Sequence, residues 1–318
     1  MPHPSDAAGQ TAPPLPTASQ RPSPGQRPVL LIVGCGDVGL RVLRLLRGRW
    51  RVLALSSSPQ RLDALRQAGA VPLLGNLDDP ASLRRLAGLA DAVLHLAPPT
   101  GQGLQDSRTR HLLQALALGV ARGGRLRRLV YASTTGVYGD AGGAVFDECR
   151  PVAPATDRAR RRVDAEGRLR RFGRDHGVAV TLLRIPGIYA TDRPGGHPRE
   201  RLMRGSPVLR AEDDVYTNHI HADDLARACV AALHRGAPQR VLHVCDDTDL
   251  RMGDYFDLAA DLCGLPRPPR ISRAQAQQTL PAMQLSFMSE SRRLLNHRLK
   301  AELRLVLRHP TVVQGLLA

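Results

Sequence analysis

Short apolar runs alternate with longer amphipathic stretches along most of this 318-residue chain. The run Val29–Val33 is continuously apolar, as expected for a strand that is buried on both faces of a parallel sheet, and it ends in a glycine-rich loop. After the loop, Leu40, Leu43 and Leu46 recur on one face of a helix. The two patterns then repeat. The chain is therefore predicted to be an α/β protein with a doubly wound parallel sheet.

The same patterns place the remaining elements and divide the chain into three parts. Further strands are expected at 50–55, 71–74, 92–96, 129–132, 179–185 and 241–244, and helices at 60–68, 80–89, 104–122, 155–176 and 223–235. Residues 1–27 are rich in Pro, Ser, Gln and Ala without apolar periodicity, which predicts a disordered tail. Residues 28–187 and 218–245 are assigned to the nucleotide-binding domain. Residues 188–217 and 246–318 are assigned to a smaller, mostly helical substrate cap.

The charge balance is strongly basic, with a net charge of +16 and Lys300 as the only lysine among 45 basic residues. The arginines are spread along the whole chain and aromatic residues make up 3%, so a nucleic-acid partner is disfavoured. Five scattered cysteines form no Cys-x-x-Cys pair, which fits a reducing compartment. No apolar run is long enough for a membrane span or a signal peptide. A cytoplasmic protein without a membrane partner is expected.

Residues 34–39 read Gly-Cys-Gly-Asp-Val-Gly, the G-x-G-x-x-G pattern, between an expected strand and an expected helix. Gly34 permits a tight turn, Gly36 lets the backbone approach a pyrophosphate, and Gly39 lets the helix pack against the strand. The helix N-terminus offers free N–H groups to the phosphates. For Cys35, a small filler side chain is favoured over a redox role. We assign the whole loop to a dinucleotide cofactor, namely Gly34, Cys35, Gly36, Asp37, Val38 and Gly39.

The end of the second strand bears on the choice between NADP and NAD. NAD sites usually carry Asp or Glu there to bind the ribose 2′-hydroxyl. This chain has Ser56, Ser57 and Ser58, followed by Arg61. Hydroxyls and an arginine suit a 2′-phosphate better, so NADP is preferred over NAD. The serines also suit a cap for a helix that begins at Pro59, and both roles stay open.

Five segments, in order, resemble motifs of the NAD-dependent epimerase/dehydratase group of the extended and atypical short-chain dehydrogenase/reductase superfamily. The segments are 75–80, 91–97, 131–139, 183–189 and 219–226, within a resemblance that runs from about Val29 to Leu317. It implies a Rossmann fold, an NAD(P) cofactor, and hydride transfer at a carbonyl or carbinol carbon of an unidentified, nucleotide-sugar-like small molecule. It also adds cofactor residues, namely Asn76, Leu77, Leu96, Ala97, Pro98, Ser133, Pro186 and Ile188.

The family's chemistry rests on a Tyr-x-x-x-Lys motif, in which the Lys lowers the pKa of the Tyr. Lys300 has no tyrosine four residues before it, so the motif is absent. When the chain is aligned on Glu166, Arg158 stands in the Tyr place and Arg162 in the Lys place; a one-residue shift would bring Asp157 to the Tyr place. Arginine stays protonated and cannot be a general base. The proton donor stays open, as does the alternative of a catalytically silent dinucleotide sensor.

The resemblance implies four further site residues. Thr134 matches the family's Ser/Thr and is expected to orient a substrate oxygen as the catalytic residue. Tyr138, Tyr189 and Arg193 are expected at the substrate. For Tyr138, a ring packed at the wall of the site is favoured over a catalytic phenol. For Arg193, binding of an anionic substrate group and an ordinary loop arginine are equally supported.

Two other patterns are given structural interpretations. His219-x-His221-x-Asp223 could imitate a metal site, but a turn in which Asp223 caps the next helix is favoured, and no metal is predicted. The stretch 158–174 holds eight arginines. We interpret it as a solvated helix rather than an anion or nucleic-acid face. So many charges make dimerisation through this helix doubtful, and both a monomer and a homodimer remain open.

Overall fold

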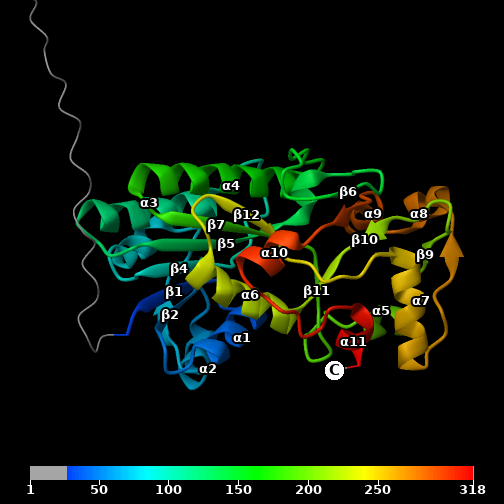
Figure 1. Ribbon diagram of the computed structural model, residues 1–318, viewed down its shortest axis with the longest axis horizontal. Coiled ribbons are helices and arrows are strands. Elements are labelled where there is room, and N and C mark those ends of the chain that lie inside the picture. Colours follow the sequence, from blue (N-terminus) through cyan, green and yellow to red (C-terminus); the bar gives the residue numbers. More distant parts are fainter. Residues whose placement is uncertain (1–26, 318) are drawn as a thin grey trace, which may run out of the picture.

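A seven-stranded parallel sheet forms the centre of the computed structural model, which describes residues 27–317 (Figure 1). The predicted tail lies outside this range apart from Arg27. The strands are β1 (Val29–Val33), β2 (Arg51–Ser56), β3 (Val71–Leu74), β4 (Ala92–His95), β5 (Arg128–Thr134), β7 (Ala179–Ile185) and β12 (Arg240–His243). Their order is β12-β7-β5-β4-β1-β2-β3. The predicted doubly wound α/β fold is confirmed, and the order reverses between β1 and β4, where such sheets bind ligands.

Helices cover both faces of the sheet, above and below it in Figure 1. One layer holds α1 (Asp37–Leu46), α2 (Leu62–Gln67) and α6 (Ala222–Arg235); the other holds α3 (Ser107–Ala121) and α4 (Asp157–His176). The expected helix at 60–68 is split into a 3-10 turn, η1 (Pro59–Arg61), and α2. The expected helix at 80–89 is instead a 3-10 helix, η2 (Pro80–Leu86), which the Asp79 side chain caps by accepting from the Ala81 N–H.

The rest of the chain builds a smaller body beside the carboxyl edge of the sheet (Figure 1). It has its own apolar core, which includes Val208, Tyr255 and Phe256. Its elements are short: η3 (Thr135–Tyr138), β6 (Val145–Phe146), β8 (Gly187–Tyr189), α5 (Arg199–Met203), β9 (Val208–Leu209), β10 (Tyr216–Thr217), β11 (His219–His221), β13 (Leu250–Arg251), α7 (Met252–Cys263), β14 (Arg270–Ile271), α8 (Arg273–Thr279), α9 (Ala282–Met288), β15 (Arg293–Leu294), α10 (His297–Glu302) and α11 (Val312–Leu316). Not all of them belong to that core.

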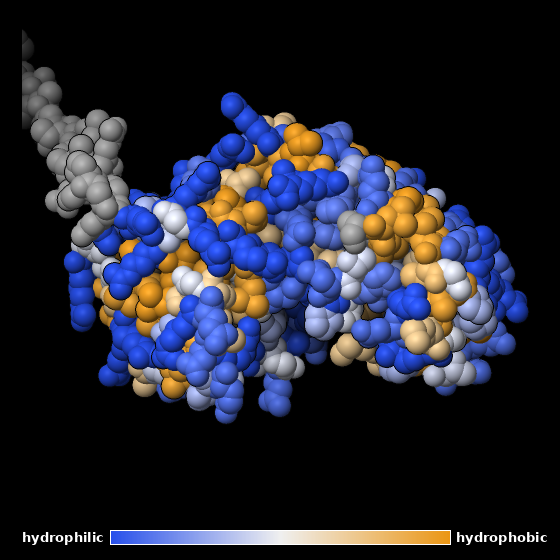
Figure 2. Space-filling view, turned by 90° about the horizontal axis from the view of Figure 1, so that it is seen from below, coloured by the Kyte–Doolittle hydropathy of each residue, from blue (hydrophilic) through white to orange (hydrophobic). Residues whose placement is uncertain are grey.

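One segment differs from the predicted cap. Leu299, Leu303 and Leu305 pack into the core of the sheet with α1 and α6, although 246–318 was assigned to the cap. Their burial draws α10 onto the large body, where Glu302 also accepts from the Arg240 guanidinium at 2.8 Å. The surface is notched between the two bodies (Figure 2). Within residues 27–317, no helix is both long and apolar enough to cross a membrane.

Candidate functional site

The glycine loop between β1 and α1 has the geometry that a pyrophosphate site needs. Gly34 has φ +84°, and a Cβ there would lie 2.5 Å from the Ala97 backbone nitrogen. A Cβ on Gly39 would lie 3.0 Å from the Cys35 sulfur, so α1 packs closely on the loop. A Cβ on Gly36 would meet nothing within 4 Å. The open space over Gly36, at the N-terminus of α1, therefore fits a phosphate group.

The one acidic side chain of this loop is neutralised within the protein. Asp37 accepts from Arg193 at 2.8 Å and from Arg41 at 3.2 Å. Arg41 is 4% exposed and also pairs with Asp192 and Asp223. Its guanidinium lowers the pKa of Asp192. An anionic cofactor at the helix N-terminus would therefore meet no uncompensated carboxylate from Asp37.

A cavity of about 270 Å³ lies between the glycine loop and the end of β2, where adenosine binds in this fold. Ser56, Ser57 and Arg61 line it, and no carboxylate does so within residues 27–317. Arg61 Nη2 donates to the Cys35 carbonyl at 2.7 Å, which holds the guanidinium at the cavity. The same cavity brings together six other residues predicted for the cofactor: Gly34, Cys35, Asn76, Leu77, Ala97 and Pro98. The sequence missed Arg108, which also lines it.

Three predictions at this end are corrected or sharpened. The Ser58 hydroxyl donates to the Gln60 side chain, and Ser58 neither lines the cavity nor caps η1 with its side chain. The Ser133 hydroxyl donates to Glu166 at 2.6 Å, so it is not available to a cofactor. Burial raises the pKa of the Cys35 thiol to about 11, which supports the filler role.

A second small cavity, of about 200 Å³, continues along the glycine loop toward β5 and β8. Arg193 and Ile188 line both this cavity and the largest one, so the three spaces follow one edge of the sheet. The remaining predicted cofactor residues lie here or at the junction: Gly36, Asp37, Val38, Gly39, Leu96 and Pro186. Residues predicted for the cofactor thus line this edge from three segments of the sequence: the glycine loop, the residue after β4 and the residues that follow β7.

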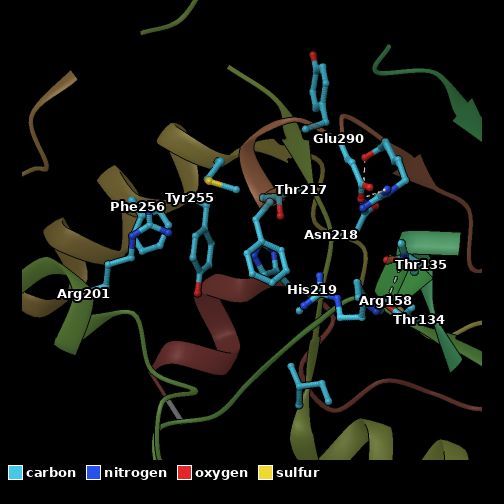
Figure 3. Close-up of a pocket in the computed structure, with 18 of the residues that line it drawn as sticks. Thr134, Thr135, Arg158, Arg201, Thr217, Asn218, His219, Tyr255, Phe256 and Glu290 are labelled. Carbon is cyan, nitrogen blue, oxygen red and sulfur yellow. Dashed lines mark hydrogen bonds and ion pairs between the residues drawn. The ribbon is translucent and has the colours of Figure 1, made fainter. Parts of the chain in front are cut away.

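The largest cavity, of about 600 Å³, lies between the sheet and the smaller body. Figure 3 shows Thr134, Thr135 and Arg158 at one end and Arg201 with Phe256 at the other. Thr134 ends β5, and its hydroxyl accepts from the Gly136 N–H at 3.3 Å. The lining includes Arg158 and Arg162 of α4, in the places aligned with the family's Tyr and Lys. Asp157 is exposed, pairs with Arg160 and does not line the cavity, so nothing supports the shifted alignment.

Two tyrosines predicted at the substrate are turned into the protein instead. Tyr138 is 1% exposed; Arg184 Nη1 donates to its hydroxyl at 2.7 Å, and His243 Nε2 lies 2.6 Å from it. Because His243 Nδ1 faces the Leu295 carbonyl at 3.0 Å, Nε2 is the acceptor for the Tyr138 hydroxyl. Tyr189 is 2% exposed and faces α11. Neither phenol lines the cavity. Arg193, the third predicted residue, does.

Several cavity residues had no functional assignment in the sequence. His219 lines the cavity, stacks on Tyr255 with ring centroids 4.1 Å apart, and has a buried Nδ1 without a partner. Burial lowers its pKa to about 4, so the imidazole is neutral. Glu290 accepts from Arg292 at 2.6 Å. His219 lies in the family-like segment 219–226 but was given no role at the substrate, and Glu290 lies in none of the segments that the sequence singled out.

The histidine and aspartate pattern after β11 is a helix start. His221 Nδ1 accepts from the Asp223 N–H at 3.2 Å, so His221 rather than the predicted Asp223 caps α6. Potential ligand atoms of His221, Asp223 and His309 lie within 4.8 Å of one another. The Asp223 carboxylate is, however, bound by Arg41 at 2.6 Å. The absence of a metal stays a prediction.

Comparison with known proteins decides the family. The model of the NAD-dependent epimerase/dehydratase family matches residues 30–245. The chain belongs to this family. It is 28% identical over 243 residues to the protein YeeZ of Escherichia coli, which covers 74% of this chain and 84% of YeeZ. It is 27% identical over 266 residues to dTDP-glucose 4,6-dehydratase of Streptomyces niveus, an alignment that covers 74% of this chain and 77% of the dehydratase.

Two solved structures superpose over almost the whole chain. A conserved protein of unknown function from Silicibacter pomeroyi shares 31% identity at a TM-score of 0.75, covering 92% of this chain and 97% of its own. UDP-glucose 4-epimerase of Thermotoga maritima, solved with UDP-glucose, shares 18% identity at a TM-score of 0.74. The match covers 91% of this chain and 96% of the epimerase. The second likeness concerns the fold alone. NAD binding is a property of the family, and the NADP preference goes beyond it.

Proposed function

We propose that this protein binds NADP in preference to NAD and transfers hydride at a carbonyl or carbinol carbon of a nucleotide-sugar-like substrate. The observation that carries the proposal is the pair of connected spaces at the sheet edge: a dinucleotide groove with Ser56, Ser57 and Arg61 at its adenosine end, and a cavity beyond it that begins at Thr134. The adenosine end of the groove has no lining carboxylate within residues 27–317. A 2′-phosphate would therefore gain a guanidinium partner and meet no lining carboxylate.

The far end of the cavity supports a phosphate-bearing substrate. Arg201 lines it with its guanidinium carbon 4.3 Å from the centre of the Phe256 ring. It has no acidic partner in the described chain, its Nη2 donates only to the Pro207 carbonyl at 3.3 Å, and burial lowers its pKa. A phosphate oxygen would satisfy this guanidinium. Because the Thermotoga maritima relative binds UDP-glucose, nucleotide sugars are the first substrates to test.

The roles at the reacting end follow from side-chain chemistry. The nicotinamide ring of the bound cofactor supplies or accepts the hydride. Thr134 orients the reacting oxygen through its hydroxyl. Arg158 and Arg162 stay protonated, so they stabilise negative charge near that oxygen and take no proton from it. The proton then passes to or from water or the substrate itself.

A non-enzymatic sensor is the second candidate. The observation that favours it is that arginines occupy both places that the alignment gives to the family's Tyr and Lys. A sensor would bind the reduced and oxidised cofactor with different affinities and would catalyse no turnover.

A turnover assay separates the two candidates. The protein is incubated with NADP+ or NADPH and with UDP-glucose or UDP-glucuronic acid, while cofactor absorbance and the sugar NMR spectrum are followed. Sugar conversion that falls about tenfold in Thr134→Val, with NADP affinity unchanged, supports the enzyme. Tight cofactor binding without conversion across a wider panel of nucleotide sugars favours the sensor. Tighter binding of NAD than of NADP contradicts the cofactor assignment.

A further inference from the structure

Two arginines with no acidic partner face the cavity at the end of β5. Arg158 and Arg162 lie one turn apart on α4 and both line the cavity. Arg162 Nη1 donates to the Tyr131 hydroxyl and to the Ala132 carbonyl, both at 2.9 Å. These bonds fix the guanidinium, and its Nε and Nη2 make no hydrogen bond within residues 27–317. Arg158 lies over the Phe287 ring, 4.9 Å from its centre, and forms no ion pair in the same range.

The neighbouring carboxylates are already used by other arginines. Glu290 is the only carboxylate among the described residues that line the cavity, and it accepts from Arg292 at 2.6 Å. Asp157, the neighbour of Arg158 in the sequence, accepts from Arg160 at 2.9 Å. Of the five arginines in the lining, Arg193 pairs with Asp37 and Arg292 pairs with Glu290. The other three, Arg158, Arg162 and Arg201, have no acidic partner within residues 27–317. The positive charge at this end is therefore not balanced within the described protein.

Such an arrangement costs stability without a ligand. Like charges one turn apart on a helix repel each other, and the half-buried Arg162 also loses part of its hydration, whereas Arg158 is exposed. We propose that Arg158 and Arg162 form an anion subsite, which binds a carboxylate or phosphate group of the substrate beside the oxygen that Thr134 orients. The subsite narrows the proposed function, on which it rests, to substrates that are acidic at the reacting end: sugar acids or phosphorylated sugars rather than neutral sugars. The two guanidinium groups offer the forked donors that such oxyanions need.

Binding of simple anions tests the subsite directly. With the dinucleotide groove filled by excess NADPH, inorganic phosphate and malonate are each titrated calorimetrically into wild type, Arg158→Gln and Arg162→Gln. A charge-assisted hydrogen bond is worth enough for an affinity loss of about tenfold or more in each variant. Arg160→Gln is the matched control: it removes the same charge from the same helix, but Arg160 is exposed and does not line the cavity. It should bind both anions like wild type.

The outcomes are distinguishable from failure of the proposed function. Tighter binding of phosphate indicates a phosphorylated substrate, tighter binding of malonate indicates a sugar acid, and both support the subsite. No binding of either anion, or equal losses in all three variants, overturns it. If NADPH itself does not bind, the cofactor proposal fails, and the comparison of Arg158→Gln with Arg160→Gln still tests the subsite. Arg158→Gln loses no hydrogen bond within the described chain, so it should fold even if Arg162→Gln does not.

Discussion

The proposed cofactor end and the proposed substrate end of the cleft are built in different ways. The cofactor end depends on backbone: within six consecutive residues, Gly34 makes the turn, Gly36 leaves the space and Gly39 brings the helix close. The substrate end depends on side chains from β5, α4, α5, β11, α7, α9 and the segments between them. A backbone site survives many substitutions, whereas a side-chain site changes chemistry when two residues change. The comparison explains how a sequence can contain the glycine loop and yet no Tyr-x-x-x-Lys segment.

Helix α4 shows the same contrast on its two faces. Its buried face keeps Glu166, which is 4% exposed and accepts from Arg184 Nη2 at 2.7 Å. Its cavity face carries Arg158 and Arg162 instead of the family's Tyr and Lys. The packing that positions the helix is thus independent of the chemistry that the helix presents to the cavity.

The largest expected effect is a loss of stability caused by a substitution on the buried face of α4. Glu166→Gln leaves the Arg184 guanidinium, 4% exposed, without its counter-ion and should lower the free energy of unfolding by about 3–5 kcal/mol. Urea denaturation measures the change. Asp175→Asn, at an exposed position of the same helix, is the control and should alter stability by less than about 0.5 kcal/mol. Equal stability of the two variants would show that this pair does not anchor α4.

The next effect concerns the cofactor end. Gly36→Val places a side chain in the open space over the helix N-terminus and should weaken dinucleotide binding by about a hundredfold or more, or roughly 3 kcal/mol. Calorimetry measures the affinity, and circular dichroism checks the fold. Gly167→Ala, in α4 with open space around it, should leave binding unchanged. Cofactor affinity that survives Gly36→Val would remove the glycine loop from the binding site.

The next effect is the dependence of folding stability on pH, to which the buried histidines contribute; one of them, His219, lines the substrate cavity. Burial lowers the pKa of His219 and His243 to about 4 and that of His95 to about 3. In the unfolded chain these groups titrate near 6.5, so between about pH 4 and 6.5 the unfolded state binds more protons. Each histidine therefore makes stability rise with pH by about 1.4 kcal/mol per pH unit there. Asp246, whose pKa is raised to about 7 by burial, has the opposite effect over the same window.

The variant His219→Phe isolates one of these contributions. The Phe ring can keep the stack on Tyr255, and no hydrogen bond to Nδ1 is lost. Thermal unfolding from pH 4 to 7 should show a shallower rise of stability than in wild type. His297→Phe, at an exposed position, should leave the pH dependence unchanged. An unaltered slope in His219→Phe would mean that His219 is not held neutral by burial.

The smallest expected effect concerns the selectivity of binding for NADP over NAD. Arg61→Ala should weaken NADP binding by about tenfold and leave NAD binding unchanged, because the contact proposed for its guanidinium is with the 2′-phosphate, which NAD lacks. Competition titrations with both cofactors measure the ratio. Arg66→Ala removes a nearby exposed arginine that pairs with Asp63, and it should not change the ratio. Equal losses for both cofactors in Arg61→Ala would contradict the selectivity.

The difference between the two ends also explains what the sequence could predict. The strands and the glycine loop follow from local patterns, and Val29–Val33 and Ala179–Ile185 have the predicted bounds. The direction of a side chain depends on distant partners: Tyr138 turns away from the cavity because its hydroxyl bonds to His243, 105 residues later. Likewise, Arg201 and His219 reach the cavity only through the packing of the smaller body. No periodicity in the sequence contains that information.

Calorimetric titration of the purified protein with NADP+, NADPH, NAD+ and NADH tests the central claim most directly. The account predicts that the dinucleotides bind, with NADP(H) preferred over NAD(H) by about tenfold or more, since one charged contact to the 2′-phosphate is worth at least about 1.4 kcal/mol. Failure of all four to bind would mean that the groove has lost its ligand. Tighter binding of NAD(H) would contradict the role given to Ser56, Ser57 and Arg61.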